Sequence, residues 1–217
     1  MNWKLTAIRY ARSVLPENMI FAGGNPEKSR PISFVMYDVE VEGKHILVDP
    51  GCDTMPGFVM EDYVLPLDAL KALGITPELV SDVIITHAHH DHIDCVRHFP
   101  NSVIHVQKLE AQRGNAYLKD CVHVETFEDE TLVADCVKVK KIGGHSVGSC
   151  VVELDAEDKT WVIAGDECYS YDCLNLQIPT GSSCCPENSR KFVEEYVREE
   201  YRVLLCHDPD TITGPII

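Results

Sequence analysis

Positive charge is scarce in this sequence. Among 217 residues, 19 lysines and arginines stand against 35 aspartates and glutamates, so the formal net charge is −16 at pH 7. A surface with this much negative charge repels phosphate backbones. The composition therefore argues against nucleic acid as a general partner.

Long apolar runs are missing as well. No window approaches the ~18 consecutive apolar residues that a membrane-spanning helix needs, and Met1–Tyr10 lacks the apolar core of a signal peptide. There is no internal repeat or low-complexity segment, and the hydrophobic fraction of 45% is ordinary for a globular protein. We therefore expect one domain over residues 1–217, located in the cytoplasm and without a membrane partner.

The ten cysteines contain no Cys-x-x-Cys pair, which weakens the case for a zinc ribbon. An even number of cysteines indicates a disulfide framework in short secreted chains, but this chain is long and carries no export signal. We expect reduced thiols, most of them buried as small apolar side chains. The adjacent pair Cys184 and Cys185, in a polar loop, has no explanation from the sequence.

Apolar periodicity and turn residues predict alternating strands and helices. The predicted strands are Ile32–Val41 and Lys44–Asp49, joined by a tight turn at Glu42-Gly43, then Asp82–Thr86, Val103–Val106, Thr131–Lys141, Ser149–Leu154, Thr160–Ala164 and Tyr201–Cys206. The predicted helices are Leu65–Leu73, Lys108–Ala116 and Glu187–Glu200. Two sheets with helices on their outer faces would fit this order.

A dense run of metal-binding residue types follows the apolar strand Asp82–Thr86. The run is His87-Ala88-His89-His90-Asp91-His92. His87 and His89 are two residues apart, so an extended segment points both side chains to one side. Neutral imidazole and carboxylate are ligands that zinc accepts, and α/β proteins place their chemistry beyond strand ends. The run therefore predicts a metal site.

Three further residues share this context of an apolar strand followed by a polar side chain. They are His145, Asp166 and His207. A catalytic zinc takes three protein ligands and a water. The ligands in the histidine run together with these three exceed what one ion needs, so the sequence favours two metals.

The pattern His-x-His-x-Asp-His, followed by the spaced His145, Asp166 and His207, resembles the metallo-β-lactamase superfamily. The resemblance implies an α+β fold, a four-layer αββα sandwich, with a two-metal site at one edge. It implies that one metal takes His87, His89 and His145, and that the other takes Asp91, His92 and His207. Asp166 would bridge the two, and Asp49 would support the site without being a ligand.

Within the superfamily, the spacing is similar to the N-acyl-homoserine lactonase branch, which has a tyrosine three residues after its bridging aspartate. Tyr169 holds that position here, with Tyr171 as the competing tyrosine. This chain departs from the branch at Ile93-Asp94-Cys95, where small residues are usual. The resemblance thus implies hydrolysis of a small ester-type substrate, first of all a lactone. A thioesterase of the glyoxalase II type, a small-molecule phosphodiesterase and a non-catalytic metal sensor remain open.

The implied mechanism uses a hydroxide that bridges two divalent ions, zinc first, with iron, manganese or cobalt as alternatives. Tyr169 would stabilise the oxyanion, and Asp91 or Asp166 would move the proton. The catalytic residues expected are therefore Asp91, Asp166 and Tyr169. A cover for the site would come from Val14–Pro31, Met55–Tyr63 or Tyr171–Ser183. The sequence leaves both a monomer and a homodimer open.

Overall fold

The computed structural model describes residues 3–54, 57 and 59–217. Met55, which begins one of the segments predicted to cover the site, and Pro56 and Phe58 within that segment, lie outside the described residues. The chain divides into two compact units. The first unit comprises Met1–Ala11, Phe34–Glu128 and Ile212–Ile217, and the second comprises Arg12–Ser33 and Asp129–Thr211.

A seven-stranded sheet runs in the order β12-β1-β2-β3-β4-β5-β6. It belongs to the first unit except for residues 12–16 and 29–33, which belong to the second. Its strands are β1 (Trp3–Pro16), β2 (Ser29–Val41), β3 (Lys44–Val48), β4 (Val80–Ile85), β5 (Val103–Gln107), β6 (His123–Phe127) and β12 (Gly214–Pro215). The predicted hairpin is confirmed: β2 and β3 pair antiparallel, and Glu42 and Gly43 take the positive φ angles of 51° and 80° that a two-residue hairpin turn requires.

From β3 to β6 the strands run parallel. Parallel strands covered on both faces are rich in apolar residues, and in β4 and β5 the residues Val83, Ile84, Ile85, Ile104 and Val106 are fully buried. The histidine run therefore begins at the end of a rigid, buried strand.

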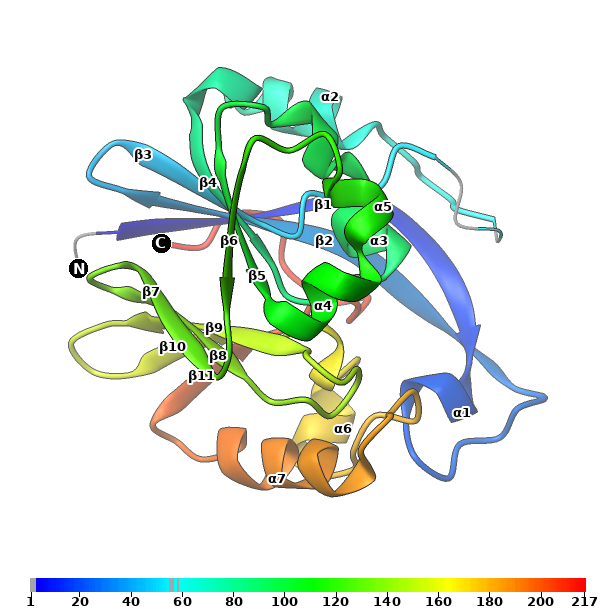
Figure 1. Cartoon of the computed structure of the whole chain (residues 1–217). Helices are drawn as coiled ribbons and strands as arrows, with labels where there is room; N and C mark the ends of the chain where they lie inside the picture. The colour runs from blue at the N-terminus through cyan, green and yellow to red at the C-terminus, as the bar shows by residue number, and fades with distance from the viewer. Residues whose placement is uncertain (1–2, 55–56, 58) are drawn as a thin grey trace. The chain divides into compact units, whose positions relative to one another are not determined.

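The first unit has short helices, and Figure 1 shows α3, α4 and α5 as a group beside β5. They are α2 (Pro66–Ala72), η1 (Pro77–Leu79), α3 (His90–Ile93), η2 (Asp94–His98), α4 (Lys108–Arg113) and α5 (Asn115–Leu118). The helix predicted over Leu65–Leu73 is confirmed as α2, and Gly74, at φ 81°, follows its end. The helix predicted over Lys108–Ala116 is divided at Gly114 into α4 and α5.

Strand β1 was missed by the sequence pattern. Along Trp3–Pro16 the alternation of buried and exposed residues slips at Ala7-Ile8 and again at Tyr10-Ala11, where two neighbours are both buried. These slips break the period of two on which a strand prediction depends.

The second unit contains a five-stranded sheet in the order β11-β10-β9-β8-β7. Its strands are β7 (Glu130–Ala134), β8 (Val137–Lys141), β9 (Cys150–Asp155), β10 (Thr160–Ile163) and β11 (Tyr201–Leu204), and its helices are α1 (Glu17–Ile20), η3 (Gly165–Glu167), α6 (Tyr171–Asn175) and α7 (Pro186–Tyr196). The single strand predicted over Thr131–Lys141 is wrong. Ala134 pairs with Val137 across a two-residue turn that contains Asp135, a turn-forming residue type, so β7 and β8 form a hairpin.

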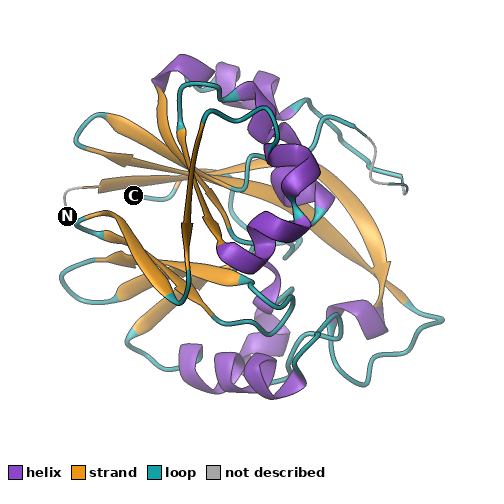
Figure 2. Ribbon diagram, in the orientation of Figure 1, coloured by secondary structure: helices purple, strands orange, loops and turns teal. Residues whose placement is uncertain are grey.

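Helix α7 begins with Pro186 in its first turn and ends at Tyr196, four residues before the predicted end at Glu200. The reason is pairing with the sheet: the Glu200 carbonyl accepts a hydrogen bond from Thr160 N–H, just before β11 pairs with β10. Phe192 and Val193 of α7 pack with Val151 of β9 in the core of the second unit. Figure 2 shows α7 as a continuous helix.

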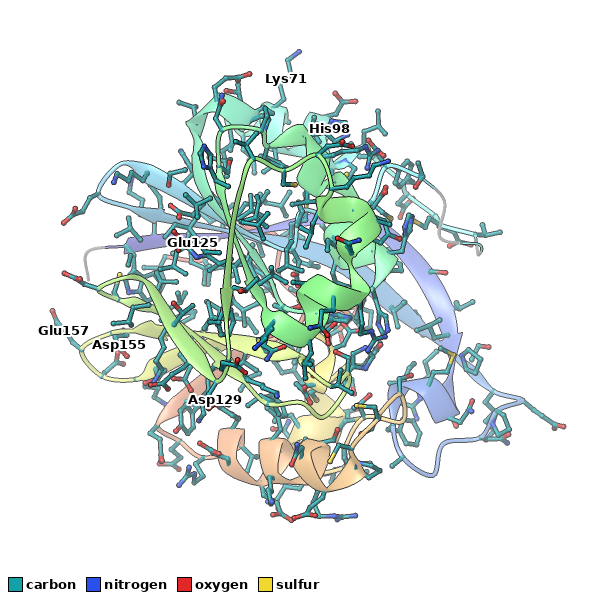
Figure 3. All side chains as sticks on the ribbon, in the orientation of Figure 1. Lys71, His98, Glu125, Asp129, Asp155 and Glu157 are labelled. Atoms are coloured by element: carbon teal, nitrogen blue, oxygen red, sulfur yellow. The ribbon has the colours of Figure 1, made fainter. Side chains whose placement is uncertain are left out.

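Two acidic residues occupy one turn of the second unit. In Figure 3, Asp155 and Glu157 lie at the turn between β9 and β10. None of the described helices is long and apolar enough to cross a membrane. The structure shows all ten cysteines as thiols, six of them buried.

Phe192→Ala should lower the free energy of unfolding by about 3–5 kcal/mol, because it removes a fully buried aromatic ring and leaves a cavity. Urea denaturation of the metal-free protein measures the change. Leu132→Ala is the control, since Leu132 is 66% exposed and should change stability by less than about 0.5 kcal/mol. Equal effects of the two substitutions would contradict the packing described for α7.

Candidate metal centre

Four side chains of the first unit form what we call the first half-site: His87, His89, Asp91 and His92. His87 Nε2 and His89 Nδ1 lie 3.0 Å apart, so the two imidazoles turn ring nitrogens toward one place, as residues two apart in an extended segment can. The His87 and His92 ring centroids are 4.2 Å apart, and His92 Nε2 lies 3.5 Å from Asp91 Oδ2.

Asp49, which directly follows β3, holds this half-site in place through hydrogen bonds to Thr86 and His92. Its carboxylate accepts hydrogen bonds from Thr86 N (2.8 Å), Thr86 Oγ1 (2.7 Å) and His92 Nδ1 (2.8 Å). Because an ionised carboxylate can only accept, His92 carries its proton on Nδ1 and keeps a lone pair on Nε2. Because the Thr86 hydroxyl donates its hydrogen bond to Asp49, Thr86 Oγ1 accepts a hydrogen bond from His87 Nδ1 at 3.1 Å. Nε2 of His87 is thereby left as a metal-binding atom.

A second buried carboxylate, which the sequence did not single out, holds the backbone of the same loop. Glu110 of α4 is fully buried, and its Oε2 accepts from Ala88 N at 2.9 Å. Ala88 lies between His87 and His89, so this contact fixes the peptide that joins them. Glu110 resembled an ordinary polar helix residue in the sequence, because a partner that is a backbone N–H leaves no side-chain pattern.

His90 turns toward another group of residues. Its Nδ1 lies 2.9 Å from Tyr117 Oη, and its Nε2 lies 3.0 Å from Thr54 Oγ1. Asp94 belongs to the unusual Ile93-Asp94-Cys95 sequence, and its Oδ2 accepts from the backbone N–H groups of Asp53 (3.1 Å) and Thr54 (3.2 Å). Asp94 therefore holds the loop at residues 53–54 in place.

The second half-site consists of His145, Asp166 and His207, all of the second unit and all buried. His145 follows β8, Asp166 lies in η3 directly after β10, and His207 follows β11. Asp166 Oδ1 lies 2.9 Å from His207 Nε2, and Asp166 Oδ2 lies 3.4 Å from His145 Nε2. One carboxylate thus turns an oxygen toward each of two imidazoles.

Backbone carbonyls set the orientation of both imidazoles. His145 Nδ1 donates to the Ser182 carbonyl at 2.5 Å, and His207 Nδ1 donates to the Ser33 carbonyl at 2.7 Å. Since a carbonyl can only accept, both rings carry the proton on Nδ1 and present the Nε2 lone pair to Asp166.

This arrangement fits a cation. In neutral rings, the Nε2 lone pairs of His145 and His207 face carboxylate oxygens, so acceptors face acceptors in a buried place. A divalent cation would attract all of these atoms, and the donor set of imidazole nitrogen and carboxylate oxygen suits zinc, iron, manganese or cobalt. Each half-site therefore has the chemistry of metal ligands.

Of the two candidate tyrosines, Tyr169 is the one in contact with this half-site. Its hydroxyl donates to Asp166 Oδ2 at 2.5 Å, and its ring stacks on His207 with centroids 4.9 Å apart. Tyr171 packs instead against the core of the second unit, where burial raises its pKa to about 12.

Glu167 is the other carboxylate that the sequence missed. It directly follows Asp166 and is fully buried, and burial raises its pKa to about 7. Its side chain accepts from the backbone N–H groups of Gly144 and His145 and from the Ser149 hydroxyl.

One further group of metal-binding residue types lies in the first unit, where ligand atoms of Asp53, Cys95 and His98 come within 4.8 Å of one another. Here the Arg97 guanidinium already bonds to the Asp53 carboxylate, so a cation is present without a metal. His98, labelled in Figure 3, donates from Nε2 to Asp53 Oδ2 at 2.6 Å. This cluster is an ion-pair network.

A family model described as the metallo-beta-lactamase superfamily matches residues 33–204 of the chain. Over 238 aligned residues, the chain is 25% identical to an N-acyl homoserine lactonase of a Bacillus species, and the alignment covers 97% of this chain and 95% of that protein.

Solved structures show the same fold. The crystal structure of a quorum-quenching N-acyl homoserine lactone lactonase matches with a TM-score of 0.82 at 24% identity, covering 95% of this chain and 92% of that one. An N-acyl homoserine lactone hydrolase, with the product N-hexanoyl-L-homoserine bound at its catalytic metal centre, matches with a TM-score of 0.81 at 23% identity, covering 95% and 94%.

Asp49→Ala should lower the free energy of unfolding of the metal-free protein by about 2–4 kcal/mol. The substitution leaves the buried Thr86 N–H without its acceptor and places alanine at φ 54°, a left-handed conformation that costs L-residues about 1–2 kcal/mol. Asp49→Asn, which tolerates that φ and keeps one acceptor oxygen, should cost less. Denaturant titration of both variants measures the difference, and wild-type stability of Asp49→Ala would refute the support that we assign to Asp49.

Proposed function

Because the chain belongs to the metallo-β-lactamase superfamily and is a metal-dependent hydrolase, we propose that it hydrolyses a lactone at a centre of two divalent metal ions. The predicted family and the predicted metallo-β-lactamase fold are confirmed by the match over residues 33–204 and by the shared fold. The relatives named above act on N-acyl homoserine lactones, which makes a lactone the first candidate for the substrate.

The observation that carries the proposal is the Asp166 carboxylate, which turns one oxygen toward His145 and the other toward His207. A carboxylate placed in this way suits a bridge between two ions. We assign one metal to His87, His89 and His145 and the other to Asp91, His92 and His207, with Asp166 shared. Zinc is the first candidate for both positions, and iron, manganese and cobalt accept the same ligands.

When bound, two divalent ions would supply an activated water at neutral pH and polarise the carbonyl of the substrate. The residues of the chain then have separate tasks. The Nδ1 acceptors Asp49, Ser182 and Ser33 keep imidazole Nε2 atoms aimed at the centre. Asp91 and Asp166 are the carboxylates that can take up the proton released by water and deliver it to the leaving alkoxide.

Tyr169 has the position to act on the substrate oxygen. Its hydroxyl is within hydrogen-bond distance of Asp166, and the stacking on His207 holds the ring in place. A phenol that can turn from a carboxylate to a developing oxyanion stabilises the transition state more than the ground state. We therefore assign oxyanion stabilisation to Tyr169 and not to Tyr171.

The remaining sequence predictions become part of the proposal. We propose that both units belong to one metallo-β-lactamase-like domain over residues 1–217, because the family match extends across sequence from both units. We also retain a small molecule as the substrate, no nucleic acid or membrane as a partner, and a location in the cytoplasm.

A substrate panel tests the reaction class. The zinc-loaded protein should hydrolyse lactones faster than thioesters, aryl esters or bis-p-nitrophenyl phosphate, and chelation should abolish turnover. Asp166→Ala should reduce hydrolysis to the background rate, whereas Asp158→Ala, at the exposed turn between β9 and β10, should leave it unchanged. Preference for a thioester or the phosphodiester would favour those alternatives. Full activity of Asp166→Ala would refute the two-metal assignment, and stable metal binding without any turnover would favour the sensor.

Tyr169→Phe should lower kcat for lactone hydrolysis by about 100-fold, the cost of losing one oxyanion donor, and should change KM little. Tyr171→Phe is the matched control and should keep kcat within about twofold of the wild type. Steady-state kinetics on the best lactone of the panel distinguish the two. If Tyr171→Phe shows the larger loss, the roles of the two tyrosines are reversed.

A further inference from the structure

We propose that Glu167 is a positioning residue of the metal centre, whose buried carboxylate holds the backbone of Gly144 and His145 and so fixes the place at which His145 presents Nε2. The proposal rests on the assignment of His145 as a metal ligand in the proposed function. Glu167 itself is not a ligand, because its oxygens are directed to the loop backbone.

The contacts of Glu167 converge on one short segment. Oε1 accepts from Gly144 N and His145 N, each at 3.2 Å, and Oε2 accepts from His145 N at 3.2 Å. Oε1 also accepts from the hydroxyl of Ser149, at the end of the same loop. A fully buried carboxylate is tolerated only where such donors replace water, so the loop and the carboxylate depend on each other.

The peptide group between Gly144 and His145 also has partners for its carbonyl oxygen. The Gly144 carbonyl accepts from Cys184 N at 2.9 Å and from Cys185 N at 3.0 Å, and from Ser183 Oγ at 3.0 Å. Glu167 therefore closes a clamp in which both the N–H and the C=O groups around His145 have partners. Within the clamp the adjacent cysteines act through their backbone N–H groups.

The clamp also requires glycine at position 144. A Cβ built there would lie 2.3 Å from Glu167 Oε2 and 2.9 Å from the backbone nitrogen of Ser189. No side chain fits between the loop and these atoms without displacing one of them. The close approach is thus part of the site, and a methyl group at Gly144 would push the loop away from Glu167.

Glu167 is the chain neighbour of Asp166, the residue to which we assign the bridge between the two metals. Glu167 follows Asp166 within the three-residue helix η3 (Gly165–Glu167). This turn sends one carboxylate toward the imidazoles of His145 and His207 and the next toward the backbone of His145. One short turn thus fixes the position of the Asp166 carboxylate and, through Glu167, the position of His145.

Zinc binding tests the proposal without relying on activity. Glu167→Gln keeps the size of the side chain but replaces one acceptor oxygen by an NH₂ group, which cannot accept from the backbone N–H of His145. We expect zinc affinity, measured by chelator competition on the metal-free protein, to fall about 10- to 100-fold, as is usual when a partner of a ligand is removed. The absorption spectrum of the cobalt-loaded variant should also change, because the ligand geometry changes.

Glu153→Gln is the matched control. Glu153 is a buried glutamate of the same unit, held by Lys138 at 2.7 Å and Tyr196 at 2.7 Å on the sheet. Its substitution should lower stability while leaving zinc affinity and the cobalt spectrum as in the wild type. Gly144→Ala provides a second variant, which displaces the clamp and keeps the carboxylate, and it should weaken zinc binding as Glu167→Gln does.

The outcomes separate this proposal from the proposed function. If the wild-type protein binds no zinc, the metal centre itself is refuted. If the wild type binds zinc and both Glu167→Gln and Gly144→Ala bind it with unchanged affinity and an unchanged cobalt spectrum, only the positioning role of Glu167 is overturned. If Glu153→Gln weakens zinc binding as much as Glu167→Gln, the effect is one of general stability and the proposal is likewise overturned.

Discussion

The direction of imidazole lone pairs is the constraint on which this site depends. A neutral histidine binds a metal through one nitrogen only if the other nitrogen carries the proton. His92 donates a hydrogen bond from Nδ1 to a carboxylate, His87 donates one to a threonine hydroxyl, and His145 and His207 donate theirs to backbone carbonyls. In both units the fold provides acceptors at the Nδ1 side of a ring. The Nε2 atom of each ring then carries the lone pair that a metal can accept.

Several of the carboxylates that support the site follow strand ends. Asp49 directly follows β3, and its partner Thr86 directly follows the buried strand β4. Asp166 lies in η3, shortly after the end of β10, and the adjacent Glu167 holds the loop of His145. Both sheets contain parallel and antiparallel pairs, and both supply the same arrangement: a buried apolar strand ends, and a polar side chain near its end lies in a fixed place. Catalytic groups on such supports need little reorganisation when a substrate binds.

The candidate ligands could be proposed from the sequence because they form patterns. His87, His89 and His92 lie close together directly after an apolar strand, and Asp166 and His207 repeat the context of a strand end. Glu110 and Glu167 could not be predicted in the same way. Their partners are backbone N–H groups, which every residue except proline carries, so no spacing in the sequence marks them.

The strands likewise divide into those that the sequence pattern predicts and those that it misses. The hairpin at Glu42-Gly43 was predicted because its turn demands residues that accept positive φ, whereas β1 was missed because its buried residues do not alternate regularly. The Cys184-Cys185 pair had no explanation as thiols. The structure shows that their backbone N–H groups hold the Gly144 carbonyl, which is a role that any two non-proline residues could perform and that the sequence could not reveal.

The most direct test of the metal centre is anomalous X-ray diffraction at the zinc absorption edge from crystals of the zinc-loaded protein. The account predicts two anomalous peaks in each chain, one contacted by His87, His89 and His145 and the other by Asp91, His92 and His207, with Asp166 in contact with both. A single peak, or peaks away from these seven side chains, would contradict it.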